Sequence, residues 1–209
     1  MKIKFSFLIA ILITTCSINV LAQKAVLFGV RDNEYARIGY QDKWNWYVMV
    51  EHSVFVTKLK NQVINGYAGY KGNVQKFKYN GCLYGGIHYG GMYKMMGGMA
   101  EVKYPLLSWC NMFGGIRPHY DTSYGYDTAF RAGLSFAFHK AISLRGEFTS
   151  YPEYRVCEKR IKAGLDFKVM ELIVSPEISI PIEGNIETIR LLMNFRYELH
   201  LQKFLSILN

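Results

Sequence analysis

Charged side chains of both signs recur at alternate positions along the C-terminal half of the chain, and they are the residues most able to bind a solute. Their spacing puts them on one face of a series of strands, because every second residue of a strand points the same way. Glu177 shares that face. Arginine and lysine outnumber the acids, so the face predicts either a lining that attracts anions or an internal network of ion pairs. Such a network would pair Arg145, Glu147, Arg196 and Glu198. The binding residues that we predict are Arg131, Arg145, Glu147, Lys162, Asp166, Arg190, Arg196 and Glu198.

The five histidines give weaker evidence for a catalytic site than the charged residues give for solute binding. A hydrolase needs a nucleophile and a base within hydrogen-bond reach, with an acid that orients the base. Ser135 and His139 share a strand face, but four residues along a strand separate them by about 13 Å. His119 and Asp121 fall in an expected loop, which is an alternative place for catalysis. We predict no enzyme and no catalytic residue, with a lipid-modifying hydrolase as the alternative.

Cofactor and nucleic-acid binding lack a sequence signal. The chain has no glycine-rich phosphate loop, no zinc-ligand spacing and no calcium loop, so we predict no cofactor and no metal. The formal net charge is +9, but lysines and arginines are interleaved with acids and form no basic stripe. We therefore expect no nucleic-acid partner.

Period-two alternation is the strongest structural signal in the chain. Apolar residues of one parity oppose polar and charged residues of the other, whereas a helix would need apolar positions three and four apart. Tyrosine and phenylalanine are abundant and proline is scarce, which favours strands. The clearest apolar series are Phe130 to Phe138, Ile142 to Phe148, Ile161 to Phe167, Leu172 to Ile180 and Ile189 to Leu199. The stretch from Gly66 to Gly98 is rich in glycine and tyrosine, and its facing stays open.

Turn signals divide the mature chain into about twelve antiparallel strands in an up-and-down meander, with ten as the fallback. We place turns at Asp32-Asn33, Asp42-Lys43, Lys58 to Gln62, Gly72-Asn73, Gly90-Gly91, Pro105 to Ser108, His119 to Gly125, His139-Lys140, Tyr151-Pro152, Val169-Met170 and Pro181 to Asn185. The longer connections then fall at one end and the tight turns at the other, which is the asymmetry of bacterial outer-membrane barrels. Twelve is also an even number of strands, which returns both chain ends to the same side, as in bacterial barrels.

The N-terminus has the pattern of a cleaved secretory signal peptide over residues 1–22. Lys2 and Lys4 precede an apolar run, and Val20-Leu21-Ala22 supplies a peptidase site. Cleavage would lower the formal charge from +9 to about +7. A membrane-anchoring helix and lipidation at Cys16 are the alternatives. Residues 23–209 then form a single domain, in which Cys82, Cys110 and Cys157 are expected to be apolar packing residues.

The chain resembles the small outer-membrane β-barrel proteins of Gram-negative bacteria. The features that it shares with them are the export signal, the period-two alternation and the many aromatic residues. The resemblance spans the mature chain and rests on pattern alone. It implies an all-β transmembrane barrel with charged side chains in its lumen, and aromatic girdles that include Trp44, Trp46, Tyr151, Tyr154, Phe195 and Tyr197. One departure is that the chain continues past Leu199 to Asn209, whereas such proteins commonly end on an aromatic residue.

The resemblance also implies partners and a location. The expected partners are outer-membrane lipid, the barrel-assembly machinery, and small solutes or none. The expected function is a structural barrel or a narrow pore with a charged lumen. The competing interpretation is a soluble secreted barrel of lipocalin-like architecture, in which apolar side chains line the interior and charges face water.

Overall fold

The computed structural model describes residues 23–32, 34–53, 62–90, 94–123, 125–150, 159–183 and 189–199. Within these ranges the chain forms strands joined by turns. The strands are β1 (Gln23–Arg31), β2 (Tyr35–Asp42), β3 (Trp46–His52), β4 (Val63–Val74), β5 (Phe77–His88), β6 (Lys94–Leu107), β7 (Cys110–Asp121), β8 (Gly125–His139), β9 (Ile142–Thr149), β10 (Arg160–Val169), β11 (Leu172–Pro181) and β12 (Arg190–Leu199). The predicted signal peptide, Cys157 and the last ten residues lie outside the described ranges.

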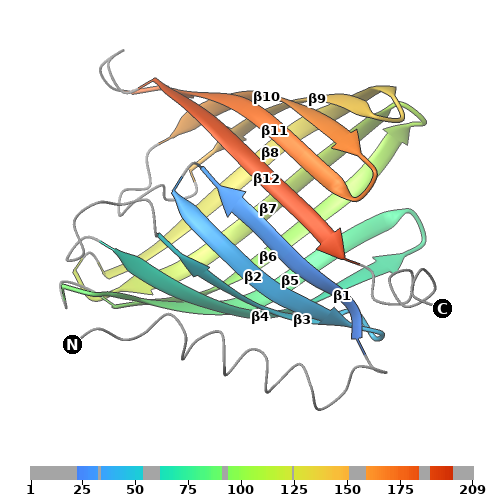
Figure 1. Ribbon diagram of the computed structural model, residues 1–209. Coiled ribbons are helices and arrows are strands. Elements are labelled where there is room, and N and C mark those ends of the chain that lie inside the picture. The colour runs from blue at the N-terminus through green and yellow to red at the C-terminus, as the bar shows by residue number, and fades with distance from the viewer. Residues whose placement is uncertain are drawn as a thin grey trace.

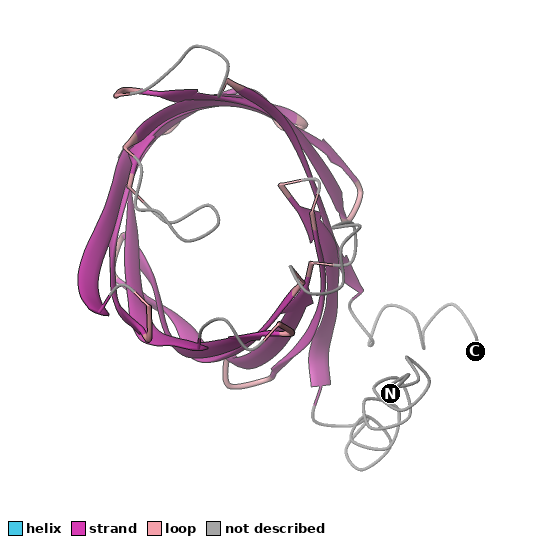
Figure 2. Ribbon diagram, turned by 90° about the vertical axis from the view of Figure 1, so that its left-hand side faces the viewer, coloured by secondary structure: helices cyan, strands magenta, loops and turns pink. Residues whose placement is uncertain are grey.

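The strands form one closed antiparallel barrel in which each strand pairs with its neighbours in sequence. Closure comes from β1 and β12, whose register runs from Val26 opposite Leu199 to Val30 opposite Phe195. Figure 1 shows these two strands side by side, and Figure 2 shows the strands arranged as a ring. The predicted twelve-stranded meander is confirmed, so the ten-stranded fallback is not needed. No helix in the described ranges is long and apolar enough to cross a membrane.

The two ends of the barrel differ in the length of their connections. At one end, four hairpins turn through pairs of residues: Gln75-Lys76, Ser108-Trp109, Lys140-Ala141 and Met170-Glu171. Lys43 to Asn45 joins β2 to β3 at this end, which we call the tight-turn end. The long connections after β3, β9 and β11 all lie at the opposite end, the long-loop end. The predicted asymmetry is therefore confirmed.

Several predicted turns are misplaced by a few residues. Gly72-Asn73 lies inside β4, and the chain reverses at Gln75, which adopts a φ of 53°. Pro105 lies inside β6, where the pairing with β7 shifts register between Pro105 and Leu107. Glycine, asparagine and proline are ordinary turn residues, but here Gly72 and Asn73 pair in regular register with Tyr79 and Lys78, and Pro105 lies beside a register shift.

Side chains alternate between two environments along every strand. On β3, Val48 is 43% exposed whereas Glu51 is 1% exposed. The large apolar side chains that are exposed on the strands lie, in register, on the same face of the sheet as Val48, so they point outward. The opposite parity carries the charges and is shielded by the ring of strands. The apolar face is thus the exterior and the charged face the interior.

Glycines on the inner face make room for aromatic rings. A Cβ placed on Gly69 would lie 2.8 Å from Cζ of the Tyr47 ring, and Tyr47 is 6% exposed. Gly133 has the same relation to Phe113, at 2.6 Å from Cζ. Gly66, three residues earlier on β4, lies on the outer face opposite Val50, where an added Cβ would meet nothing within 4 Å. The glycine-rich sequence of β4 and β5 therefore serves interior packing at some positions only.

This difference predicts opposite responses to the same substitution. Gly69→Ala should lower the free energy of unfolding by about 1–3 kcal/mol, because the added methyl displaces the Tyr47 ring or the neighbouring strand. Gly66→Ala should be neutral or stabilise by about 0.4–1 kcal/mol, because it only restricts the unfolded chain. Equilibrium unfolding in urea, followed by intrinsic fluorescence, measures both. Equal effects of the two variants would contradict the packing role of Gly69.

Candidate functional site: the charged barrel interior

The charged residues predicted from the sequence fall on the inner parity of β8 to β12. Arg131 lies opposite Thr149, and Lys162 lies opposite Glu147, so β8, β9 and β10 share one register of inward positions. Arg190 lies opposite Ser179, and Arg196 opposite Ile173, on the same face of β11 and β12. The strands therefore hold these side chains in the interior through the alternation that places apolar residues outside.

Glu177 is the acid around which cations of β9 and β10 gather. Its side chain is 4% exposed and accepts from Nη2 of Arg145 at 2.6 Å. Nζ of Lys162 lies 3.4 Å away on its other oxygen. We predicted that Arg145, Glu147, Arg196 and Glu198 form a paired network. The structure instead pairs Arg145 with Glu177, while Arg196 and Glu198 form a loose pair at 3.9 Å.

A second buried carboxylate, Glu51, joins four strands near the long-loop end. Arg31 donates from Nε and Nη2 to its two oxygens at 3.1 Å each. Arg37 reaches Oε1 at 2.7 Å, and the Tyr67 hydroxyl donates to Oε2 at 2.8 Å. This carboxylate, 1% exposed, therefore has charged or hydrogen-bonding partners from β1, β2 and β4. A charge so deeply buried is tolerated because it is paired and hydrogen-bonded.

Aromatic contacts extend this group around the interior. The Tyr67 ring stacks on Tyr84, with centroids 5.8 Å apart. The Arg117 guanidinium lies over the Tyr84 ring at 4.2 Å from its centroid. Together with Glu51 these contacts link β1 to β7. We call Arg31, Arg37, Glu51, Tyr67, Tyr84 and Arg117 the Glu51 belt.

A polar row crosses the interior closer to its middle. The Tyr47 hydroxyl donates to Asn80 at 2.9 Å, and Asn80 donates to Glu101 at 3.4 Å. Glu101 in turn lies 3.0 Å from Nε of Arg131, one of the predicted residues. The row thus connects the first half of the barrel to β8.

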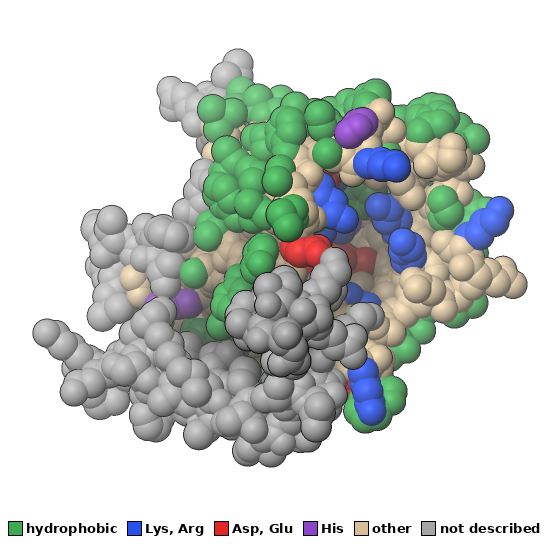
Figure 3. Space-filling model, turned by 45° about the vertical axis from the view of Figure 1, so that its right-hand side comes forward, with side chains coloured by type: hydrophobic (Ala, Val, Ile, Leu, Met, Phe, Trp, Pro, Cys, Tyr) green, Lys and Arg blue, Asp and Glu red, His purple; other side chains and the backbone are tan. Residues whose placement is uncertain are grey.

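Cations concentrate at the tight-turn end. Lys78 and Lys103 are direct register partners on β5 and β6, both on the inner parity and exposed. Lys103 also interacts electrostatically with Arg145, Asp166 and Arg196 on strands β9, β10 and β12. Figure 3 shows lysine and arginine side chains gathered around the hollow at this end, with acids deeper inside. Because these cations outnumber the acids beside them, this part of the interior has a positive potential. The direct opposition of Lys78 and Lys103 is unfavourable for stability.

The histidine and aspartate that we placed in a loop lie elsewhere. His119 and Asp121 belong to the last residues of β7, on its inner face, and are 8% and 5% exposed. Nδ1 of His119 lies 3.2 Å from the Arg117 carbonyl, and Asp121 accepts from the Ser123 amide at 2.7 Å. Among the described residues, no group of three or more histidine, cysteine or acidic side chains could hold a metal ion. Cys82 and Cys110 are free and buried.

Several interior residues escaped the sequence interpretation. Glu51, Arg31 and Arg37 belong to strands whose charges are few, and Lys78, Glu101 and Lys103 fall in or beside the stretch whose facing stayed open. A signal was present: Glu51 has the parity opposite to Val48 and Val50. What the sequence could not supply was the register that brings residues of different strands together.

Comparison with solved structures finds porins whose fold is similar to that of this barrel. A KdgM porin in complex with disordered oligogalacturonate has a TM-score of 0.63 and 9% identity, covering 85% of this chain and 99% of that one. A second KdgM porin structure has a TM-score of 0.56 and 9% identity, covering 84% and 96%. A NanC porin structure has a TM-score of 0.47 and 10% identity, covering 85% and 98%. No protein-family profile and no curated protein matches the chain.

At these identities the likeness establishes the fold, a closed porin-type barrel. The resemblance to small outer-membrane barrel proteins, inferred from the sequence pattern, is confirmed at that level.

The Glu51 belt makes a prediction about stability. Glu51→Gln should lower the free energy of unfolding by about 3 kcal/mol, because it leaves the half-buried Arg31 and Arg37 without their shared counter-charge. Glu198→Gln is the matched control. Its 3.9 Å pair with Arg196 is partly exposed, so its loss should cost about 0–1 kcal/mol. Urea unfolding of both variants measures the difference. Similar losses would show that the belt does not depend on Glu51.

Proposed function

We propose that this protein is an outer-membrane diffusion channel with a narrow, charged lumen that favours anionic solutes. The observation that carries the proposal is the inverted polarity of the closed barrel, with apolar side chains outside and charged side chains inside. In a soluble barrel the charged face would meet water and the apolar face would form the core. An exterior that is apolar around a whole ring of strands is suited to hydrocarbon, because closure leaves no backbone edge to satisfy.

Aromatic side chains at the barrel ends support the membrane location. Trp46 is 59% exposed, and its ring contacts Tyr70 at 5.2 Å between centroids. Trp44 is 61% exposed in the adjoining turn. Both lie at the tight-turn end, where an interfacial girdle of Trp and Tyr is expected. Phe195 and Tyr197 point outward on β12, while Tyr151 and Tyr154 lie outside the described residues.

The interior charges support the preference for anions. The inward cations of the strands are Arg31, Arg37, Lys71, Lys78, Lys103, Arg117, Arg131, Arg145, Arg160, Lys162, Lys168, Arg190 and Arg196. The inward acids are fewer: Glu51, Glu101, Asp121, Asp127, Glu147, Asp166, Glu177 and Glu198. A water-filled passage with this balance attracts anions. One of the similar porins was solved with oligogalacturonate, an acidic sugar oligomer, and this compound is a reasonable first solute to test.

The alternatives have less support. A lipocalin-like binder requires an apolar-lined cavity, whereas the charged side chains of this barrel point into its interior. For an outer-membrane hydrolase, Ser135 and His139 are too far apart along β8, and we propose no catalytic residue. The protein is expected to need barrel-assembly machinery and outer-membrane lipid, and its signal peptide to be cleaved.

Planar-bilayer recording tests the proposed function directly. Purified protein should produce stable conductance steps, and the reversal potential in a salt gradient should show preference for the anion. Oligogalacturonate added to one side should block the current at lower concentration than a neutral oligosaccharide of equal length. Absence of conductance from correctly folded barrels would contradict a channel and leave a structural barrel.

The membrane location predicts a depth-dependent cost for charge on the outer wall. Leu83→Arg, in the middle of β5 at a position 72% exposed, should lower the unfolding free energy in vesicles by about 2–4 kcal/mol. Val74→Arg, at the tight-turn end of β4 and 58% exposed, should cost about 0–1 kcal/mol. Reversible urea unfolding from phospholipid vesicles gives both values. An equally small cost at both positions would indicate that the outer wall faces water.

The anion preference predicts the effect of removing cations at the tight-turn end. Lys78→Gln combined with Lys103→Gln should lower the ratio of anion to cation permeability several-fold, because the pair adds positive potential to the lumen. Lys94→Gln also removes a lysine, but from the outer parity of β6 opposite Ile87, and should leave the ratio unchanged. Reversal potentials of the three proteins provide the measurement. Equal ratios would exclude this pair from selectivity.

A further inference from the structure

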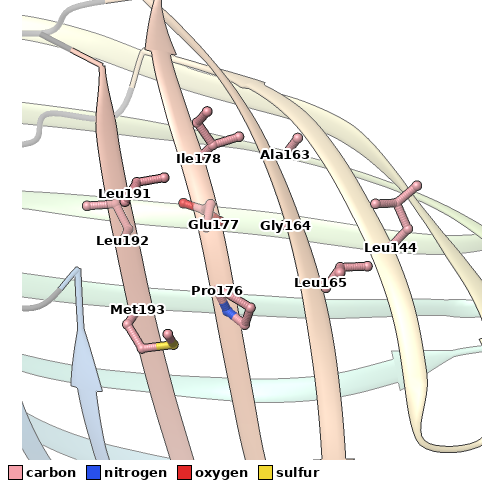
Figure 4. Close-up of a pocket in the computed structure, with 10 residues that line it drawn as sticks. All are labelled: Leu144, Ala163, Gly164, Leu165, Pro176, Glu177, Ile178, Leu191, Leu192 and Met193. Carbon is pink, nitrogen blue, oxygen red and sulfur yellow. The ribbon is translucent and has the colours of Figure 1, made fainter. Parts of the chain in front are cut away.

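A groove of about 500 Å³ interrupts the outer wall across β9 to β12 (Figure 4). Most of its lining side chains have the outward parity and are apolar. The residues that line it are Leu144, Ala163, Gly164, Leu165, Pro176, Glu177, Ile178, Leu191, Leu192 and Met193. It lies within the strands, away from the turns at either end of the barrel.

Small outward residues account for the depression. Ala163 lies between Gly146 on β9 and Ile178 on β11 in one row across the sheet. A Cβ added to Gly146 would meet nothing within 4 Å, so the wall beside Ala163 is open. Leu191, which continues the row on β12, is 77% exposed and stands out at the side of the groove. Small residues therefore form the bottom of the groove, and larger apolar side chains form its sides.

Pro176 opens the hydrogen-bond ladder at the same place. Pairing between β10 and β11 is present at Gly164–Glu177 and again at Phe167–Val174, and lapses in between. Pro176 would lie opposite Leu165 in that register, but proline has no N–H to donate to the Leu165 carbonyl. Such an interruption in a central strand is unusual, and it weakens the seam between β10 and β11 at the floor of the groove.

The single acid in the lining does not make the groove polar. Glu177 belongs to the inner parity, and its carboxylate pairs with Arg145 at 2.6 Å and Lys162 at 3.4 Å. The groove therefore offers an apolar surface, continuous with the outer wall and open to whatever surrounds that wall. A ligand with a flexible apolar chain matches this shape and chemistry, because burying such a chain removes apolar area and leaves no charge unpaired.

We propose that the groove beside Pro176 is a binding site for one acyl chain of a membrane phospholipid, held longer there than on the rest of the wall. The inference rests on the proposed membrane location. The chain covers the interrupted seam of β10 and β11 and fills the depression over Ala163 and Gly146.

Photo-cross-linking tests the site. The probe is phosphatidylethanolamine with a diazirine in the middle of one acyl chain, mixed into vesicles that contain the folded full-length protein. Cross-links should concentrate on peptides that carry Ala163 to Leu165 and Pro176 to Ile178, beyond their share of the exposed outer surface. Ala163→Trp, which fills the floor, should lower this labelling several-fold. Ala100→Trp, on the outer face of β6, is the matched control and should not.

Two outcomes would overturn the proposal. One is labelling that follows exposed outer area all around the barrel. The other is unchanged labelling in a folded Ala163→Trp protein, with folding checked by heat-modifiable gel migration. If that variant does not fold, the wild-type distribution alone decides. A wild-type protein that fails to enter vesicles would instead contradict the membrane location, and this inference with it.

Discussion

Pairing between β1 and β12 is the contact on which the other features of this protein depend. The register from Val26–Leu199 to Val30–Phe195 joins the first strand to the last, so the sheet has no edge with unpaired backbone groups. Only in a closed sheet can the apolar face of every strand be exposed to hydrocarbon, because no unpaired backbone N–H or C=O group is then exposed with it. Closure also turns the opposite face into an interior, where charges from strands distant in sequence meet.

The interior combines two kinds of electrostatic environment. Near the long-loop end, the Glu51 belt satisfies its carboxylate with two guanidinium groups and a phenol, which makes it suited to hold β1 to β4 together. Near the tight-turn end, Lys78 and Lys103 face each other in register. The first arrangement stabilises the barrel, and the second maintains a positive potential at a stability cost. Under the proposed function, the first region supports the structure and the second favours anions.

Period-two alternation predicted the barrel because most positions of β8 to β12 follow it, and hairpins between neighbours require no long-range information. It failed to assign β4 and β5, where glycine occurs on both faces: Gly66 points outward into open space and Gly69 inward against Tyr47. The inward charges of β8 to β12 were identified individually, yet the Arg145–Glu177 pair was missed. The inward cations outnumber the inward acids, and only the register and the side-chain reach decide which cation pairs with which acid.

The polarity of the barrel wall is the central claim, and fractionation of cells that express the full chain tests it most directly. The account predicts recovery in the outer-membrane fraction, with faster gel migration of the unboiled protein than of the boiled protein. A closed barrel that resists unfolding in detergent has this behaviour. Recovery as a soluble periplasmic or secreted protein would contradict the account, because the apolar exterior could not then face water.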